Sequence, residues 1–503
     1  MNPIDKFLNS ITMYRLVLYY LTVLIVVAIG AALLGILHYS ALAILFSAIV
    51  ATAACWISNE VFAYVFKAQP SVESVYITAF ILALIMTPVL PSDISGTIAI
   101  VAASILAMAS KYVLAYRKTH IFNPAAIAVV ITGIAMGAYA SWWVGNETLL
   151  PFALVGGLLI VRKIQRFDLV LSFAAVALVV TTLTVHESSW WLAAWQTMAH
   201  SAFFFFACIM LTEPATTPPT RPLRITYGAL VGLLYSPAIH LGSLYSTPEL
   251  SLVIGNVFSY AVEPKIRLML TLTGIEKTSA STSEFIFKPD RSFDFKPGQY
   301  LEWTLPHAKS DSRGNRRYFT IASAPGSGDV RLGVKFYENS STFKKALAAL
   351  RPGARMSVSQ LRGDFTLPAD ESRKLAFIAG GIGITTFASM MRHFIDEKYA
   401  PPAVLFYCNR SYEDIAYREL FEQARSELGI KTIYAVNDGP APVPHMHIGF
   451  IDTALIKSEI PDYAERTFYL SGPRSMVVAF ERQLSELGVS RTHIKTDFFP
   501  GFA

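Results

Sequence analysis

Cysteine and charge are both scarce in this chain of 503 residues. The three cysteines, Cys55, Cys208 and Cys408, lie far apart in the sequence. They supply neither the four thiolates of an iron–sulfur cluster nor a disulfide framework. Only 16% of the residues are charged, whereas 53% are hydrophobic, and the mean hydropathy is +0.43. This balance is typical of a membrane protein rather than of a soluble enzyme.

Lysine and arginine are absent from five long stretches in the first half of the chain. Each stretch is long enough for two crossings of about 20 residues, because a Lys or Arg at the centre of a membrane helix costs about 2.5–3.5 kcal/mol. We therefore expect a polytopic all-α membrane domain of about ten helices. The stretches are residues 16–66, 68–110, 119–161, 167–220 and 225–264.

The cations between these stretches all lie on one face if each stretch forms a helical hairpin. They include Lys67, Lys111, Arg162 and Arg221. The positive-inside rule makes that face cytoplasmic, which explains the net charge of +6 without nucleic acid as a partner. The apolar stretch at residues 16–37 is longer than the apolar region of a signal peptide. The sequence thus predicts a multi-pass protein of the cytoplasmic (inner) membrane with both termini in the cytoplasm.

Two helix ends resemble each other within the apolar half. They are "AFILALIMTPVLPSDISG" (79–96) and "FFFFACIMLTEPATTPPTRP" (203–222), which both run through Ile-Met into a Thr/Pro segment. The two ends are five crossings apart and so lie on opposite faces, which is the arrangement of an inverted repeat. The alternative is a chance resemblance. Because proline prevents these segments from continuing as helices, they must line a cavity or pack inside the protein.

The rest of the chain has the alternation and turns of a soluble protein. Short alternating strands over 265–370, such as "DVRLGVKFY", predict a β-barrel, and strand–helix units over 371–503 predict an α/β domain. These two domains follow a transmembrane domain at 1–264. The first strand–helix unit contains the turn "AGGIGIT". Glycines in such a turn let the backbone approach a pyrophosphate at the helix N-terminus, although any tight turn of this kind has a similar pattern.

Six segments resemble the ferredoxin-NADP reductase-like family in their order and spacing. The resemblance covers residues 266–503 and implies that the first lobe holds FAD and the second holds NADH or NADPH. Hydride transfer is then the chemistry of the cofactors, and the protein orients them and excludes water. The segments are "FKPGQYLEW", "RRYFTIASAP", "AGGIGIT", "FYCNR", "YLSGPRSMV" and "DFFPGFA".

The resemblance also implies roles for individual residues. Arg317 matches the arginine that binds the FAD pyrophosphate, Phe319 lies against the isoalloxazine, and Thr320 lies near flavin N5. Ser471 lies beside the nicotinamide, and Phe498 or Phe499 covers the other face of the flavin. The expected catalytic set is Thr320, Ser471 and Phe499. The other expected cofactor contacts are Ser341, Thr342, Gly380, Gly381, Gly383, Thr385, Gly472 and Pro473.

Three positions depart from the family pattern. Phe319 lacks the phenol of the usual Tyr, Ser471 replaces a Cys, and Thr386 replaces a Pro. These changes put the details of the hydride geometry in doubt and leave flavin binding as the expectation.

The choice of nicotinamide cofactor depends on residues after the second strand of the α/β domain. Arg410 is placed to meet the 2′-phosphate of NADPH, but Glu413 and Asp414 lie nearby and disfavour a phosphate. The sequence therefore favours NADH over NADPH.

Histidine is too sparse in the apolar half for a stack of haems. Ferric reductases and NADPH oxidases hold two haems with paired histidines on two helices. Here His200 lies well inside an expected crossing, whereas His38, His186 and His240 lie near the outer face and His120 near the inner face. A haem-containing enzyme of that type is disfavoured, and no metal site is expected.

The apolar half instead resembles a family of membrane flavoproteins, which contains RnfD of the Rnf complex and its counterpart in the sodium-translocating NADH:quinone reductase. The resemblance is carried by "THIFNPAAIAVV" (119–130), by "MLTEPATTPPTRPLRITYGALVGLLY" (210–235) and by the ten-helix layout, and covers roughly residues 1–265. Those proteins pass electrons within ion-pumping respiratory complexes. The resemblance implies a quinone or other membrane acceptor and coupling to sodium ions or protons.

The Thr/Pro segment after the second helix end is a candidate site for a second flavin. Its hydroxyls and acid can hydrogen-bond FMN or riboflavin, whereas the alternative is a simple turn that ends a helix. The relatives link FMN covalently to a Ser/Thr-Gly-Ala-Thr motif, but this chain reads "SWWVGNETLLPF" at that place, so the second flavin is expected to be non-covalent. The candidate residues are Asn123, Thr212, Glu213, Thr216, Thr217 and Thr220.

Together these features predict a membrane-bound NAD(P)H oxidoreductase of the NADH:quinone type. Electrons pass from NAD(P)H through FAD into the membrane domain and on to a quinone in the lipid bilayer. The alternative is a transporter or channel-like membrane domain that the fused reductase gates or powers. The sequence leaves partner subunits undetermined.

Overall fold

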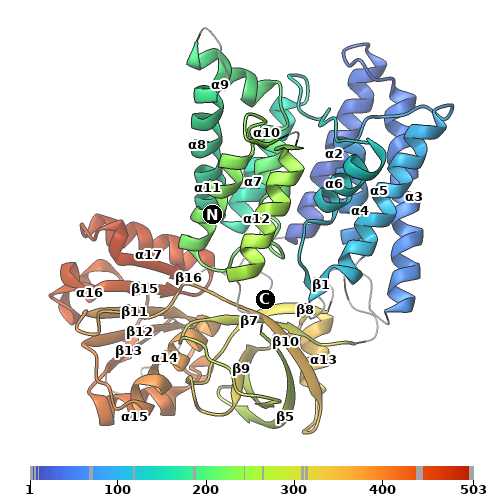
Figure 1. The fold of residues 1–503 in the computed structure, drawn as a ribbon. Coiled ribbons are helices and arrows are strands. Elements are labelled where there is room, and N and C mark those ends of the chain that lie inside the picture. Colours follow the sequence, from blue (N-terminus) through green and yellow to red (C-terminus); the bar gives the residue numbers. More distant parts are fainter. Residues whose placement is uncertain are drawn as a thin grey trace. The chain divides into compact units, whose positions relative to one another are not determined.

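The computed structural model describes residues 4, 7–8, 11–66, 72–116, 119–184, 189–242, 244–262, 266–307, 311, 315–437 and 446–497 (Figure 1). The chain divides into two compact units, Asn2–Glu263 and Pro264–Ala503, and each is considered by itself. Several residues named above lie outside the described residues. They are Lys67, His186, Phe498 and Phe499.

The first unit is built from helices. Two short hairpins accompany them, β1 (Ala115–Tyr116) with β2 (Thr119–His120) and β3 (His240–Leu241) with β4 (Leu244–Tyr245). The helices are α2 (Met13–Leu33), α3 (Ala41–Val65), α4 (Val72–Ile85), α5 (Ile94–Val113), α6 (Pro124–Met136), α7 (Leu150–Ile164), α8 (Phe167–Thr184), α9 (Trp190–Ala199), α10 (Phe203–Phe205), the π-helix η1 (Phe206–Met210), α11 (Arg221–Leu234) and α12 (Pro248–Val262).

Among the described residues, four helices are long and apolar enough to cross a membrane by themselves, namely α2, α3, α5 and α8. A fifth candidate is the pair of α9 with Phe203–Met210, which is bent by 64°. Large apolar side chains on these helices, such as Val26, Leu33, Leu171 and Leu183, are more than half exposed, as suits contact with lipid. The protein therefore has a helical membrane domain, whereas ten crossings, the inverted repeat and the orientation remain predictions.

The helix breaks of this unit follow from proline and from capping. Asn123 ends the preceding loop by accepting a hydrogen bond from the amide of Ala126, and Pro124 starts α6 at a position where its missing N–H costs nothing. After α4 ends, the amides of Ser141 and Trp142 both donate to the carbonyl oxygen of Ile85 at 2.9 Å. The backbone left open by the broken helix is thus satisfied inside the protein.

Small residues bring α8 and α11 together. A Cβ at Gly228 would lie 2.6 Å from the carbonyl oxygen of Leu169, and one at Gly232 would lie 2.6 Å from that of Phe173. Close approach through glycine is common where membrane helices pack. The ring of Phe173 then packs against Phe206 of the π-helix, with centroids 5.3 Å apart. This packing fixes η1 and therefore the start of the Thr/Pro segment that follows it.

The second unit begins with a half-barrel antiparallel sheet in the order β8-β7-β10-β5-β6-β9. Alternate residues of these strands point into one core around the fully buried Trp303. A closed barrel remains a prediction. The elements of this lobe are β5 (Arg267–Lys277), β6 (Thr282–Pro289), β7 (Tyr300–Thr304), β8 (Arg316–Thr320), β9 (Val330–Lys335), α13 (Thr342–Ala348) and β10 (Arg355–Arg362).

A parallel six-stranded sheet forms the other lobe, in the order β14-β13-β12-β11-β15-β16 (Figure 1). Every residue of β11 is buried, as expected for a central strand of a sheet covered on both faces. The strands are β11 (Leu375–Gly380), β12 (Ala403–Asn409), β13 (Lys431–Val436), β14 (Met446–Ile448), β15 (Thr467–Ser471) and β16 (Ile494–Asp497). The helices are the 3₁₀ turn η2 (Gly381–Gly383), α14 (Ile384–Asp396), α15 (Arg418–Leu428), α16 (Thr453–Glu459) and α17 (Arg474–Glu486).

Candidate flavin and nicotinamide site

The parallel sheet reverses its strand order beside β11. The chain runs from β11 to β12 on one side and later places β15 on the other side, so β11 and β15 flank a topological switch point. Ligands of open α/β sheets bind at the carboxyl ends of the strands at such a point. Here those ends carry the turns Gly380–Gly383 and Ser471–Pro473.

The two turns touch each other so closely that side chains are excluded. A Cβ at Gly383 would lie 2.4 Å from the carbonyl oxygen of Ser471, and the Cα of Gly380 is 3.1 Å from the position of a Cβ at Gly472. Gly381 has φ of +52°, in the left-handed region that favours glycine. The turn leads directly into α14, whose N-terminus attracts anions. The geometry therefore fits the pyrophosphate of a nicotinamide dinucleotide.

A buried carboxyl that the motifs did not predict lies between these turns. Thr386, in the first turn of α14, donates to Asp497 Oδ2 at 3.2 Å, and Ser471 donates to the same oxygen at 3.4 Å. Burial raises the pKa of Asp497 to about 7, although both hydrogen bonds act in the opposite direction. The available signal was its place as the first residue of "DFFPGFA"; in the fold it is the last residue of β16.

On the other lobe, one carboxylate bridges two groups expected to hold FAD. The guanidinium of Arg317 is 3.4 Å from Asp311 Oδ1, and the amide of Thr342 donates to Asp311 Oδ2 at 3.3 Å. The hydroxyl of Thr342 in turn accepts from the amide of Asp311 at 3.0 Å. The cation and the amide donor thus already hold an anionic group, which is the chemistry that a pyrophosphate needs. These residues fit FAD, provided that the phosphates displace Asp311.

Two of the remaining residues expected to contact the flavin lie on β8, and a third lies at the start of α13. Phe319 is partly buried and packs against Phe343, with ring centroids 5.9 Å apart, and its carbonyl oxygen accepts from Trp303 Nε1 at 3.3 Å. Thr320 is buried at the end of the strand. Ser341, by contrast, caps α13 by accepting from the amide of Lys344. Its oxygen therefore already has a structural partner.

Thr385 and Pro473 lie at the edges of the nicotinamide turns. Thr385 donates to the carbonyl oxygen of Ile382 at 3.1 Å, and its methyl group would lie 2.7 Å from a Cβ at Gly333 of the flavin lobe. Pro473 is the N-cap of α17. Thr385 therefore closes the turn and also contacts β9.

The carboxylate of Asp414 is engaged by the flavin lobe. Ser281 donates to Asp414 Oδ1 at 2.6 Å, and Lys335 Nζ lies 3.1 Å from Oδ2. Partial burial acts to raise the pKa of this carboxyl, but these hydrogen bonds and cations hold it below the ordinary value. Asp414 therefore has partners other than a nucleotide, which weakens the expectation that it repels the 2′-phosphate of NADPH near Arg410.

In the membrane unit, a polar network joins segments that lie far apart in the sequence. Asn123 Nδ2 donates to Glu213 Oε2 at 2.9 Å, and His120 Nε2 lies 3.0 Å from Glu213 Oε1. Asn256 of α12 accepts from the amide of Asn123 at 2.8 Å and donates to the hydroxyl of Tyr227 at 3.0 Å. Two of the predicted flavin residues, Asn123 and Glu213, therefore meet directly.

The threonines of the Thr/Pro segment use their hydroxyl hydrogens locally. Thr212 donates to the carbonyl oxygen of Cys208, Thr216 to that of Glu213, and Thr217 to that of Pro214. Thr220 is the N-cap of α11 and makes no side-chain capping bond. The first three are buried, so this geometry supports a self-contained turn and gives no positive fit to a flavin.

His200 differs in position from the sequence expectation. It lies at the bend between α9 and α10 instead of inside a helix, and its side chain is 54% exposed. Its Nε2 lies 3.2 Å from Glu147 Oε1. The imidazole of His200 therefore contacts a carboxyl group at an exposed bend of this unit.

Comparison with known families confirms the resemblances drawn from the motifs. Residues 144–267 match the NQR2, RnfD, RnfE family, residues 269–366 match the oxidoreductase FAD-binding domain, and residues 377–482 match the oxidoreductase NAD-binding domain. The last two domains form a ferredoxin-NADP reductase-like module.

Curated proteins similar to this chain include flavohemoproteins. Those of Oceanobacillus iheyensis and Bacillus subtilis are 25% and 26% identical over 231 residues. Each alignment covers 44% of this chain and 56% or 57% of the relative. The chain thus spans little more than half the length of these relatives.

Similar solved structures include two reductase domains. The flavohem-like FAD/NAD binding domain of nitric oxide dioxygenase from Vibrio cholerae is 20% identical, with a TM-score of 0.42, and the match covers 46% of this chain and 98% of that one. The cytochrome b5 reductase domain of Ulva prolifera nitrate reductase is also 20% identical. Its TM-score is 0.41, and the match covers 46% of this chain and 97% of that one.

Proposed function

We propose that this chain, which joins a membrane domain of the NQR2, RnfD, RnfE type to an FAD- and NAD-binding oxidoreductase module, is an NAD(P)H:quinone oxidoreductase. Electrons enter from NADH or NADPH, pass through FAD in the second unit, and leave through the membrane unit to a quinone. FAD, when bound, accepts a hydride and releases the two electrons singly.

One observation supports the proposed oxidation of NADH or NADPH by the second unit. The turns Gly380–Gly383 and Ser471–Pro473 lie in contact at the switch point of the sheet, and the carboxyl of Asp497 is buried beside them. The glycines admit the cofactor backbone and the N-terminus of α14 favours its phosphates. The module therefore has a binding edge shaped for a dinucleotide.

Each side chain of the site has a separate proposed role. Arg317 and the amide of Thr342 would hold the FAD pyrophosphate in the place that Asp311 takes now. Phe319 supplies an apolar surface for the flavin ring, and Thr320 supplies a hydroxyl at the strand end. Burial raises the pKa of Asp497 to about 7, so this carboxyl can take up or release a proton near neutral pH.

The proposal places the membrane unit in the cytoplasmic membrane with both termini in the cytoplasm, where NADH is available. It includes a second, non-covalent FMN or riboflavin near Asn123 and Glu213, and coupling of electron flow to sodium ions or protons. The cation-free stretches and the match to the NQR2, RnfD, RnfE family support this part.

Flavin extraction tests the proposal. Purified protein is titrated anaerobically with NADH and NADPH, and its flavin is measured before and after acid precipitation. The proposal expects more than one flavin per chain, all released by acid, and bleaching by a nicotinamide cofactor. One FAD per chain together with solute uptake into liposomes would instead support a transporter powered by the reductase.

A further inference from the structure

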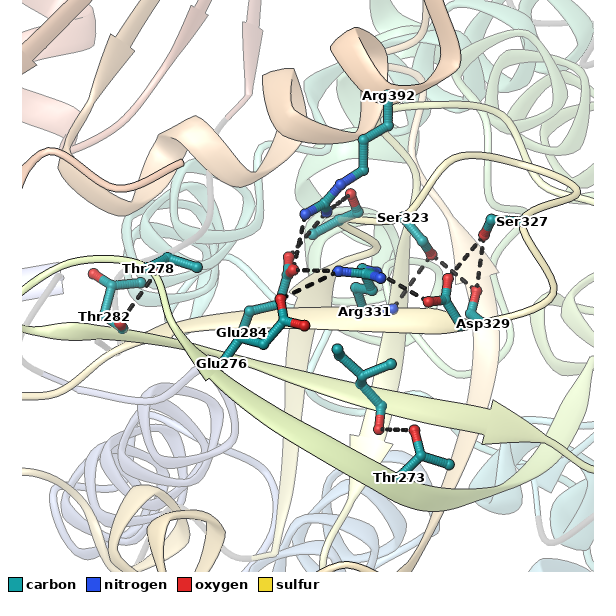
Figure 2. A network of polar contacts seen from close by, with 12 residues as sticks. Thr273, Glu276, Thr278, Thr282, Glu284, Ser323, Ser327, Asp329, Arg331 and Arg392 are labelled. Carbon is teal, nitrogen blue, oxygen red and sulfur yellow. Dashed lines mark hydrogen bonds and ion pairs between the residues drawn. The ribbon is translucent and has the colours of Figure 1, made fainter. Parts of the chain in front are cut away.

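A buried carboxylate joins the two lobes of the reductase module. Glu284 lies on β6 of the flavin lobe and its side chain is fully buried. Arg392 lies on α14 of the nicotinamide lobe and donates to both carboxylate oxygens of Glu284, at 2.9 and 2.8 Å. Figure 2 shows the guanidinium of Arg392 reaching down from its helix to this carboxylate. The pair therefore spans the junction of the lobes.

A third bond extends the same contact toward the flavin strand. Arg392 Nη1 also donates to the carbonyl oxygen of Ala322 at 2.6 Å, and the hydroxyl of Ser389 donates to that of Ser323 at 2.7 Å. Ala322 and Ser323 follow two and three residues after Thr320, at the end of β8. The helix that starts at the nicotinamide turn is thus tied to the strand that carries the flavin residues.

The same carboxylate has a second arginine partner, which lies within the flavin lobe. Arg331 of β9 lies 3.0 Å from Glu284 Oε2 and 3.0 Å from Asp329 (Figure 2). The carboxylate of Glu284 therefore pairs with one arginine in its own lobe and with one arginine in the other lobe. Burying a charge is unfavourable unless the charge is well paired, and the two arginines together neutralise the buried carboxylate of Glu284.

The surroundings show why this polar contact matters for the junction. A pocket of about 310 Å³ lies beside it, lined by Ser323, Asp329 and Arg331 from one lobe and by Arg392, Ile395 and Gln423 from the other. Tight apolar packing does not fill this part of the junction. The contacts between the lobes there are polar, and Arg392 makes three of the hydrogen bonds between them.

We propose that Arg392 is a positioning residue for hydride transfer. It fixes α14 and its nicotinamide turn against the flavin lobe through Glu284 and Ala322. The inference rests on the proposed function of the reductase module. The turn, α14 and Ser471 all belong to one lobe, so loss of the contact leaves nicotinamide binding intact. Loss of the contact instead changes the distance between the two cofactors, and a displacement of about 1 Å can reduce a rate about 100-fold.

The test compares Arg392→Met with Arg331→Met in the full-length, FAD-loaded protein. Both substitutions remove one arginine from Glu284, but only the first breaks a contact between the lobes. For Arg392→Met we expect the rate of flavin bleaching by the nicotinamide cofactor to fall about 10- to 100-fold, with the dissociation constant of that cofactor and the FAD content within about twofold of the parent. Arg331→Met should keep the parent rate. Arg392→Lys, which retains a cation without the fork, should give an intermediate rate.

A second readout does not depend on activity. Hydrogen exchange of the flavin-free full-length protein should become faster at α14 and residues 321–324 in Arg392→Met, and remain at the parent rate there in Arg331→Met. Equal effects of the two variants, or an unchanged rate and exchange in Arg392→Met, would overturn the inference. A parent protein that neither NADH nor NADPH reduces would instead overturn the proposed function, while the exchange comparison still decides the lobe contact.

Discussion

The hydroxyl of Thr386 donates to the buried carboxyl of Asp497 across 3.2 Å, and so links the first turn of α14 to the last residue of β16. Ser471 donates to the same oxygen. Thr386 and Ser471 are two of the three positions that depart from the pattern of ferredoxin-NADP reductase-like proteins. Both departures therefore contact one carboxyl, and their hydrogen bonds oppose the rise in its pKa that burial causes.

Asp497 should make stability depend on pH. Its pKa of about 7 in the folded protein lies above the value of about 3.9 in an unfolded chain, so the folded state holds the proton more tightly. The contribution of this bound proton to the free energy of unfolding is fully present below about pH 4. It is lost as the pH rises through about 7, by about 1.4 kcal/mol per pH unit. Thermal unfolding of the solubilised protein from pH 5 to pH 8 measures it.

Asp497→Asn is the matched variant, because the amide keeps the shape of the carboxyl without its titration. Its melting temperature should change less between pH 5 and pH 8 than that of the parent. Identical pH profiles of the two proteins would show that Asp497 is ionised throughout this range.

Asp311 should compete with the FAD pyrophosphate for Arg317. Because its carboxylate takes the guanidinium and the amide of Thr342, Asp311→Asn should tighten FAD binding, whereas Arg317→Ala should weaken it about 10-fold or more. Reconstitution of the flavin-stripped protein, followed by flavin fluorescence, gives both dissociation constants. Weaker binding by Asp311→Asn would mean that the carboxylate supports the site and does not compete for it.

A side chain at Gly383 should damage the nicotinamide turn. The added Cβ of Gly383→Ala would lie 2.4 Å from the carbonyl oxygen of Ser471, so one of the two turns must move. We expect the dissociation constant for the nicotinamide cofactor to rise about 10-fold or more, with FAD retained. Gly274→Ala is the control, because its Cβ meets only Ile286 Cδ1 at 3.9 Å. Equal effects of the two variants would argue against the assigned site.

Asn256 should be a stability determinant of the membrane unit. Asn256→Ala removes the acceptor of the buried amide of Asn123 and a donor to Tyr227, and an unsatisfied buried group costs about 1–3 kcal/mol. Ser259→Ala is the control one turn further along α12, because Ser259 Oγ is buried without a hydrogen-bond partner among the described residues. In detergent, the first variant should melt several degrees lower and the second should not. The reverse order would contradict the network.

Local sequence patterns predicted much of the architecture. Missing cations marked the apolar helices, proline marked their breaks, and glycine marked the turn at Gly380–Gly383, because each of these features acts within a few residues. The polar partners were not predictable in this way. Thr386 and Asp497 are 111 residues apart, and Asn123 and Glu213 are 90 apart, so only the folded chain brings them together.

The hydrogen-bond partners of the Thr/Pro segment also could not be predicted from the sequence. Its composition of hydroxyls and an acid suggested ligand binding, and the direction of those hydroxyls could not be read from composition. In the fold, Thr212, Thr216 and Thr217 donate to carbonyl oxygens of their own turn, while Glu213 binds Asn123. Satisfying open backbone at a helix break competes with ligand binding for the same hydrogen atoms.

Electron passage from the reductase unit to a quinone can be followed in a single experiment. The full-length protein in lipid nanodiscs is reduced anaerobically with NADH or NADPH and then mixed with a short-chain quinone while the flavin absorbance is followed. If electrons pass to the quinone, we expect bleaching by the nicotinamide cofactor and recovery of the oxidised flavin spectrum at a rate that matches steady-state turnover. Flavin that is bleached but stays reduced in excess quinone would contradict it.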